Sequence, residues 1–96
     1  MKRRTLHLAL CKKYFDEIKA GTKPFEFRLA TTYWRRRLEG REYDDIVITW
    51  GYPSRDDESR HLHRPWLGCE LRTITHEHFG KAPVLLFAIT VNMELK

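Results

Sequence analysis

In the stretch Gly21 to Arg28, GTKPFEFR, the spacing of apolar residues changes from that of a helix to that of a strand. This change decides which secondary structure precedes the stretch and which follows it. Before it, residues 12–21 (KKYFDEIKAG) have the period of a helix, and their final glycine is suited to end that helix in a left-handed conformation. The apolar stripe of this helix consists of Tyr14, Phe15 and Ile18. After it, residues 25–29 (FEFRL) alternate as a strand does. This alternation predicts a core face made of Phe25, Phe27 and Leu29 and an opposite face made of Glu26 and Arg28.

Four further segments have the alternation or the continuous apolar character of strands. They are residues 5–11 (TLHLALC), 43–50 (YDDIVITW), 66–75 (WLGCELRTIT) and 83–95 (PVLLFAITVNMEL). The last is the most apolar, which predicts a central strand with partners on both sides.

The remaining segments connect these strands. A second helix is predicted over residues 33–40 (YWRRRLEG), with Thr31 or Thr32 as its N-cap and Gly40 at its end. Residues 54–64 (SRDDESRHLHR) have no apolar period and are predicted to form a mobile loop. Residues 76–80 (HEHFG) are predicted to form a turn or one short helical turn.

The order of these elements predicts an α+β domain. About five strands and two to three short helices in 96 residues suit a small, partly closed β-barrel or a strongly curved mixed sheet, with a cleft flanked by the helices. The chain contains no repeat and no linker-like segment, so we expect residues 1–96 to form one domain.

The composition points to an anionic partner. The chain has 18 Lys and Arg against 13 Asp and Glu, a net charge of +5, and this excess favours polyanions, nucleic acid first. No run approaches the roughly 20 apolar residues of a membrane helix. The N-terminal apolar run, Leu6 to Cys11, is short and interrupted by His7, unlike a signal peptide. We therefore expect a cytoplasmic protein without a membrane partner.

The charges within GTKPFEFR allow two interpretations. Glu26 and Arg28 lie two residues apart on a strand and so share a face. On a solvated face they would form one weak ion pair, worth about 0–1 kcal/mol. In a cleft they would form a desolvated donor and acceptor pair suited to a base edge or a phosphate, with Lys23 at the mouth of the strand.

The same stretch fits the pattern G-x-K-x-x-E-x-R and resembles the signature of the ASCH superfamily, small domains with a PUA-like β-barrel. Gly21, Lys23, Glu26 and Arg28 match the pattern. The resemblance covers about Leu6 to Val91, including the strand and helix before the motif and the closing strand VLLFAITV. It implies a cleft lined by the lysine, the glutamate and the arginine, with RNA or a modified nucleoside as the ligand.

One branch of that superfamily, the bacterial acetylcytidine amidohydrolases, uses a lysine, a threonine and a glutamate. The resemblance places Lys23 at the lysine position and Glu26 at the threonine position, with Glu77 as a candidate for the glutamate. A carboxylate cannot act as the same kind of nucleophile as a hydroxyl, and Thr22 does not fill the threonine position. The chain thus departs from that catalytic set.

Aromatic and basic side chains elsewhere supply further candidates. Trp50 and Tyr52 flank a glycine at the end of a strand, and either one is a candidate for stacking on a base. Tyr33, Trp34 and Trp66 compete for the same role. The arginines that could follow a phosphate backbone are Arg35 to Arg37, Arg41, Arg55, Arg60, Arg64 and the basic run Lys2 to Arg4.

Two histidine pairs, His61 with His63 and His76 with His78, have a spacing that lets two side chains share a strand face. The chain has neither an HExxH nor a CxxC motif, and both pairs lie in polar segments, so we expect no metal ion and no cofactor. Either pair remains a candidate general base for RNA cleavage.

Three functions are therefore open. The leading one is an RNA- or nucleotide-binding domain: Lys23 and Arg28 meet phosphate or an acceptor edge, Glu26 accepts from an exocyclic amine or holds Arg28, and Tyr52 or Trp50 stacks. The second is an enzyme in the same cleft, with Lys23 and Glu26 as catalytic candidates. It would be a ribonuclease or an amidohydrolase of a modified nucleoside such as acetylcytidine. The third is a protein-interaction module with an acidic partner.

Overall fold

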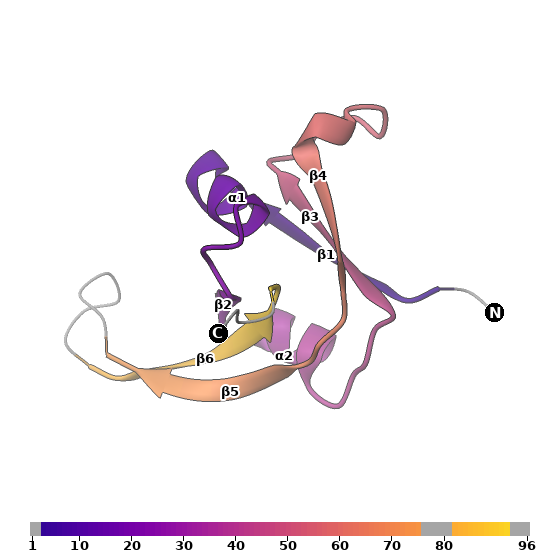
Figure 1. The fold of residues 1–96 in the computed structure, drawn as a ribbon. Helices are drawn as coiled ribbons and strands as arrows, with labels where there is room; N and C mark the ends of the chain where they lie inside the picture. Colours follow the sequence, from indigo (N-terminus) through magenta and orange to yellow (C-terminus); the bar gives the residue numbers. More distant parts are fainter. Residues whose placement is uncertain (1–2, 76–81, 93–96) are drawn as a thin grey trace.

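The computed structural model describes residues 3–75 and 82–92. Its elements, in chain order, are β1 (Thr5–Leu10), α1 (Lys12–Lys19), β2 (Phe25–Leu29), α2 (Thr32–Leu38), β3 (Asp45–Trp50), the 3-10 helix η1 (Glu58–Arg60), β4 (His61–Pro65), β5 (Cys69–Ile74) and β6 (Val84–Thr90). The strands form two three-stranded sheets, ordered β1-β3-β4 and β2-β6-β5 (Figure 1).

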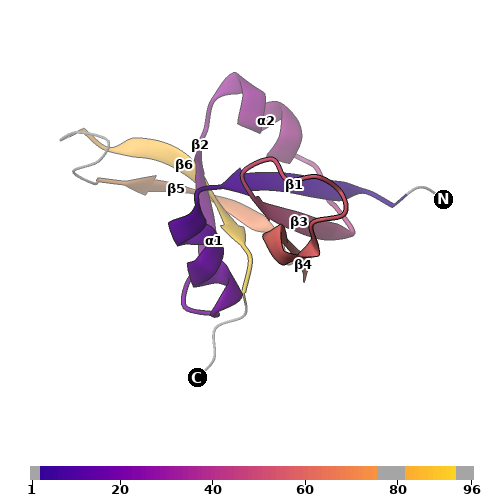
Figure 2. The same ribbon diagram turned by 90° about the horizontal axis from the view of Figure 1, so that it is seen from above.

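This architecture confirms the predicted α+β class but not its strand count, since six strands are described rather than about five. Within residues 3–75 and 82–92 each strand pairs only inside its own sheet, so these strands do not close into one barrel. No helix in this part of the chain is long and apolar enough to cross a membrane. Figure 2 shows that α1 and α2 lie on different sides of the region where the two sheets cross.

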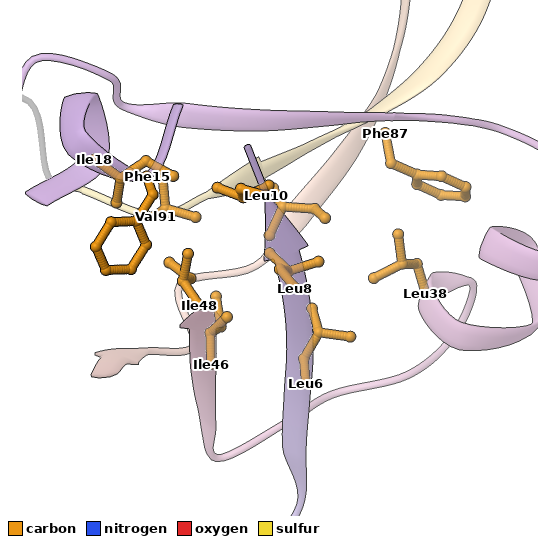
Figure 3. Close-up of a cluster of buried hydrophobic side chains, with 11 residues drawn as sticks. Leu6, Leu8, Leu10, Phe15, Ile18, Leu38, Ile46, Ile48, Phe87 and Val91 are labelled. Atoms are coloured by element: carbon orange, nitrogen blue, oxygen red, sulfur yellow. The ribbon is translucent and has the colours of Figure 1, made fainter. Parts of the chain in front are cut away.

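The first sheet buries one face and leaves the other open. β1 and β3 pair in parallel, with Leu6 opposite Ile46 and Leu8 opposite Ile48, and all four side chains are buried. Phe15 and Ile18 of α1, Leu38 of α2, and Phe87 and Val91 from the end of the chain close over this face (Figure 3). The core therefore lies between the two sheets, because alternation directs every second side chain of β1 and β3 inward.

The second sheet is antiparallel and has β6 at its centre, as predicted from its apolar sequence, with β2 and β5 on either side. Four consecutive residues of β6, from Leu86 to Ile89, are buried. A strand that is apolar on both faces does not reveal by sequence which of its faces meets the core.

The orientation predicted for β2 is wrong. Glu26 is only 5% exposed, whereas Phe27 is 38% exposed and Leu29 is also exposed. The register explains this result: Glu26 pairs with Ile89 and Arg28 with Phe87, and directly opposed residues of an antiparallel pair point to the same side. Because Phe87 and Ile89 face the core, the two charged side chains of β2 face inward as well.

The predicted loop over residues 54–64 is wrong in its second half. Residues 58–60 form η1, and β4 pairs with β3 so that Leu62 lies opposite Ile48. Leu62 and Arg64 point toward the core side of this strand, and Arg64 is bonded there by its guanidinium. Because β4 has only one apolar side chain on its inward face, its sequence shows no apolar alternation, and the strand could not be predicted from it.

The helix signals are confirmed at their ends. The Thr31 hydroxyl accepts a hydrogen bond from the Trp34 backbone N–H, so Thr31 is the N-cap of α2. Gly21 follows α1 with φ +82°, a conformation that favours glycine. Tyr14, however, is exposed rather than part of the buried stripe of α1. The predicted turn at residues 76–80, and residues 93–95 of the predicted last strand, lie outside the described residues.

Candidate functional site

Glu26 is a buried carboxylate between two cationic side chains. Its Oε2 accepts a hydrogen bond of 3.0 Å from Arg28 Nη2, and its Oε1 lies 3.7 Å from Lys23 Nζ. Oε1 also accepts from the Phe27 backbone N–H at 3.2 Å. Both oxygens therefore have partners, as a buried carboxylate requires.

Burial raises the pKa of the Glu26 carboxyl above its ordinary value of 4.5, and the charges of Arg28 and Lys23 oppose this rise without cancelling it. A buried ion pair of this kind adds little to stability, because desolvation offsets the attraction between the charges. Its effect is geometric: it fixes the direction in which Arg28 points.

Arg28 extends from β2 across to β1 and α2. Its Nη2 also donates to the Ala9 carbonyl at 3.0 Å, and its guanidinium lies 5.0 Å from the centre of the Trp34 ring. Its Nε is buried and has no hydrogen-bond partner among the described residues. Hydrogen bonds thus hold the guanidinium at Nη2, and the Trp34 ring covers one of its faces, while the Nε donor has no partner among the described residues.

Lys23 is held between two aromatic rings at the entrance to β2. Its Nζ lies 4.9 Å from the ring centre of Tyr14 and 5.2 Å from that of Phe27. These contacts, together with Glu26, account for a side chain that is only 17% exposed. Lys23 is therefore enclosed beside the predicted carboxylate rather than extended into solvent.

Asn92 fixes the backbone from which Lys23 projects. Its Nδ2 donates to the carbonyls of Ile18, at 3.0 Å, and Lys23, at 2.8 Å. Its Oδ1 accepts from Arg64 Nε at 3.1 Å. One amide side chain thus joins the end of α1, the start of the motif and β4, which positions the lysine and glutamate of the motif.

A pocket of about 560 Å³ opens on the face of the β1-β3-β4 sheet that points away from the core. We call it the aromatic pocket. Its floor comes from the three strands, one wall from β2 and α2, and another from the loop after β3. The lining residues are His7, Ala9, Arg28, Tyr33, Trp34, Val47, Thr49, Tyr52, Pro53, His61 and His63.

The aromatic pocket combines one permanent cation with aromatic rings, and no carboxylate is among its described lining residues. Tyr52 is 94% exposed, so its ring is open to a ligand. The Thr49 hydroxyl donates to the Gly51 carbonyl at 2.8 Å, which leaves its oxygen free to accept. His61 Nδ1 lies 2.7 Å from the Asp57 carbonyl, and because a carbonyl only accepts, Nδ1 carries the proton and Nε2 of the neutral ring is an acceptor.

Arg60, the last residue of η1, ties η1 to the end of β3, from which the loop that carries Tyr52 begins. The Arg60 guanidinium donates twice to the Trp50 carbonyl, at 3.1 and 2.8 Å, and lies 4.4 Å from the centre of the Trp50 ring. Gly51 has φ +65°, and this turn lets the chain pass close to Arg60. Trp50 therefore packs against the core and Arg60, while Tyr52 reaches the aromatic pocket.

The structure brings together only some of the residues predicted from sequence. Arg28 and Tyr52 line the aromatic pocket. Lys23 and Glu26 are not among its lining residues; they pair with one another, and Glu26 also pairs with Arg28. The other predicted residues lie elsewhere: Trp50 as described above, Arg35 bonded to Glu39 and to the Ala30 carbonyl, and Arg36 and Arg55 exposed outside the pocket lining.

Several lining residues were not singled out by sequence. His7 and Thr49 alternate with buried leucine and isoleucine residues on β1 and β3, and this alternation is the signal that places them on the opposite face. Trp34 was named from the sequence as a competing candidate for stacking on a base. It packs against the core and also forms a wall of the pocket.

Of the residues considered for an enzymatic role, fewer lie in the aromatic pocket. The Thr22 hydroxyl donates to the Glu17 carbonyl, and Glu77 lies outside the described residues, as do His76 and His78. His61 and His63 both reach the aromatic pocket. Among the side chains of residues 3–75 and 82–92, no three His, Cys, Asp or Glu gather as ligands for a metal ion.

Comparisons of the chain with protein-family models, with curated proteins and with solved structures found no match in any of the three. What the aromatic pocket binds must therefore be inferred from the residues that line it.

Proposed function

We propose that this protein is a small RNA-binding domain that takes one nucleotide of a single strand into the aromatic pocket. The observation that carries the proposal is the pairing of an oriented Arg28 with the rings of Tyr33, Trp34 and Tyr52 in a pocket whose described lining contains no carboxylate. A flat, acceptor-rich base with an attached phosphate is the ligand that such a lining suits best.

The roles follow from the contacts. Tyr52 supplies an exposed ring on which a base can stack, a contact worth about 1–3 kcal/mol. Arg28 donates to a base acceptor or a phosphate oxygen, and Glu26 holds Arg28 in position. The Thr49 hydroxyl and His61 Nε2 accept from an exocyclic amine. The net charge of +5 adds attraction toward any polyanion.

The resemblance of residues 21–28 to the ASCH signature supports the same proposal. We place the chain with ASCH-type domains and regard its two sheets as a PUA-like arrangement. In this assignment the motif contributes its arginine to the pocket lining, while its lysine and glutamate form an ion pair outside that lining.

A binding titration of a fluorescein-labelled single-stranded hexaribonucleotide tests the proposal. Arg28→Gln should weaken binding at least tenfold, and raising the salt concentration should weaken the wild type as well. Arg72→Gln is the matched control, because Arg72 also bonds a glutamate two residues away, Glu70, and stacks on a ring, that of Phe25. It does not line the aromatic pocket.

Two results would contradict the proposal. One is the absence of RNA binding at low salt by a folded wild-type protein. The other is equal affinity of the Arg28→Gln and Arg72→Gln variants when both retain the wild-type circular dichroism spectrum.

A further inference from the structure

A second pocket, of about 590 Å³, lies at the other end of α2. Its lining includes two cations, Arg4 and Arg41, and the indole of Trp66; Leu38, Gly40, Glu42, Gly68 and Cys69 complete it. It shares no lining residue with the aromatic pocket, and its lining likewise contains both arginine and an aromatic side chain.

The cations of the second pocket are available to a ligand. The Arg4 side chain makes no hydrogen bond or ion pair to the described residues. Its bonds are made by the backbone: the N–H donates to the Asp44 side chain, and the carbonyl accepts from the backbone N–H groups of Asp44 and Asp45. Arg41 uses Nε to donate to the Arg36 carbonyl, which directs the rest of its guanidinium without pairing it with a carboxylate there. The one carboxylate of the lining, Glu42, leaves the pocket with a net positive charge. Burial raises the pKa of the Cys69 thiol, so the thiol adds no negative charge at neutral pH.

Both pockets take lining residues from α2 and from the segment that runs from Arg4 into β1. Trp34, in the first turn of α2, lines the aromatic pocket, and Leu38, at its end, lines the second pocket. Four helical residues span about 6 Å. Beside them, Arg4 and His7 stand three extended residues apart, about 10 Å. The backbone positions that contribute to the two linings are therefore about 6–10 Å apart along these segments.

The helix surface between them is basic and aromatic. The Arg37 guanidinium lies 3.8 Å from the ring centre of Tyr33, a wall residue of the aromatic pocket. Arg36 and Arg37 are exposed, and neither forms an ion pair with another residue of the described chain. A ligand that leaves the aromatic pocket along α2 thus meets Arg37 and then Arg41.

We infer that the second pocket binds another nucleotide of the same RNA strand, with Arg37 and Arg41 on the phosphates between the two pockets. This inference rests on the proposed function of the aromatic pocket. A stacked strand advances about 3.4 Å per nucleotide, so the separation corresponds to about two or three steps. The recognised unit is consequently an oligonucleotide of three or four nucleotides, and Trp66 and Arg4 receive its far end.

The test compares AMP with oligoadenylates of two, three, four and six nucleotides, by NMR titration for weak ligands and fluorescence anisotropy for tight ones. Affinity should rise at least tenfold from AMP to the tetranucleotide and then change little. Arg4→Gln should weaken tetranucleotide binding three- to tenfold and leave AMP binding within twofold. Lys19→Gln, which removes the same charge from an exposed site at the end of α1, is the control.

The outcomes separate the two proposals. If the tetranucleotide binds no more tightly than AMP, or if Arg4→Gln behaves like Lys19→Gln, the inference about the second pocket is wrong. AMP binding that depends on Arg28 would in that case still support the aromatic pocket. If neither AMP nor any oligoadenylate binds the folded protein, both proposals fail.

Discussion

The guanidinium of Arg28 lies 5.0 Å from the centre of the Trp34 ring, and this contact joins the motif strand β2 to the helix α2 at the wall of the aromatic pocket. The Arg28 side chain is 22% exposed, so the contact is largely shielded from water. Shielding strengthens a cation–π contact relative to one on an open surface.

A double-mutant cycle measures the strength of this contact. Arg28→Gln and Trp34→Leu, alone and combined, should show a coupling of about 0.5–2 kcal/mol in the free energy of unfolding. The comparison cycle uses Arg72 and Phe25, whose ring and guanidinium lie 4.5 Å apart with a more exposed arginine. Its coupling should be smaller. Additive effects at Arg28 and Trp34 would show that the two side chains do not support one another.

Glu26 should make stability depend on pH above its ordinary pKa. Since burial raises its pKa in the folded protein, the folded state keeps a proton at Glu26 that the unfolded chain has already lost. The stabilising contribution of Glu26 is then complete below about pH 4.5 and is lost as the pH rises through the folded-state pKa. Glu26→Gln removes this decline, so its stability relative to the wild type should increase with pH. Urea unfolding between about pH 3 and pH 8 measures the difference.

Asp45 provides a control with the opposite sign. Hydrogen bonds from Thr5 and Arg3 lower the pKa of Asp45 below its ordinary value of 3.8. Its contribution is present above that value and is lost as the pH falls through the lower folded-state pKa. Asp45→Asn should therefore change only the acid side of the profile. A Glu26→Gln difference that is constant with pH would contradict the burial of its charge.

Two substitutions test which face of β2 points into the core: one of Phe27, on the exposed face of β2, and one of Phe87, the β6 residue opposite Arg28. Phe87→Ala should destabilise the protein by about 3–5 kcal/mol, because Phe87 is 2% exposed in the core. Phe27→Ala should cost about 1 kcal/mol, because 38% of Phe27 is exposed already. Chemical denaturation of both variants gives the comparison. Equal losses would place Phe27 in the core, as its alternation suggests.

Gly51→Ala should weaken RNA binding as well as stability. A left-handed φ costs a residue with a side chain about 1–2 kcal/mol, and the added Cβ would approach Arg60 Nη2 to 3.1 Å. Arg60 cannot withdraw easily, since it is bonded to the Trp50 carbonyl. The loop carrying Tyr52 should therefore shift.

Gly21→Ala is the matched control for this prediction. Gly21 also has a left-handed φ, but a Cβ there meets nothing within 4 Å. Thermal unfolding should show comparable losses for both variants, while the RNA titration should show weaker binding for Gly51→Ala alone. Equal affinities of the two variants would show that Tyr52 tolerates movement of its loop.

Local patterns were enough to find β1, β2, both helices and the central β6, because each carries its own period or cap. β4 was missed because it has one inward apolar residue, Leu62, and a single apolar residue does not indicate a strand unless the strand that it pairs with, β3, is known. The orientation of β2 was reversed for a related reason: its register with β6 decides which face is buried, and β6 is apolar on both. The motif residues did converge, but the pocket lining comes from β1, β2, α2, β3, β4 and a loop, and no local pattern specifies such a combination.

The side chain of Asn92 has a consequence for how the site forms during synthesis. β2 has β6 as its strand partner in the described sheet, and the Lys23 carbonyl is held by Asn92. Each residue of β2 leaves the ribosome about sixty residues before its partner in β6, and until then the motif is unpaired and its charges are solvated. Pairing between such distant segments is slow, because the chain loses conformational entropy on closing the loop before the stabilising contacts form. The motif residues therefore reach their final positions among the last parts of the domain to form, although they lie in the first third of the sequence.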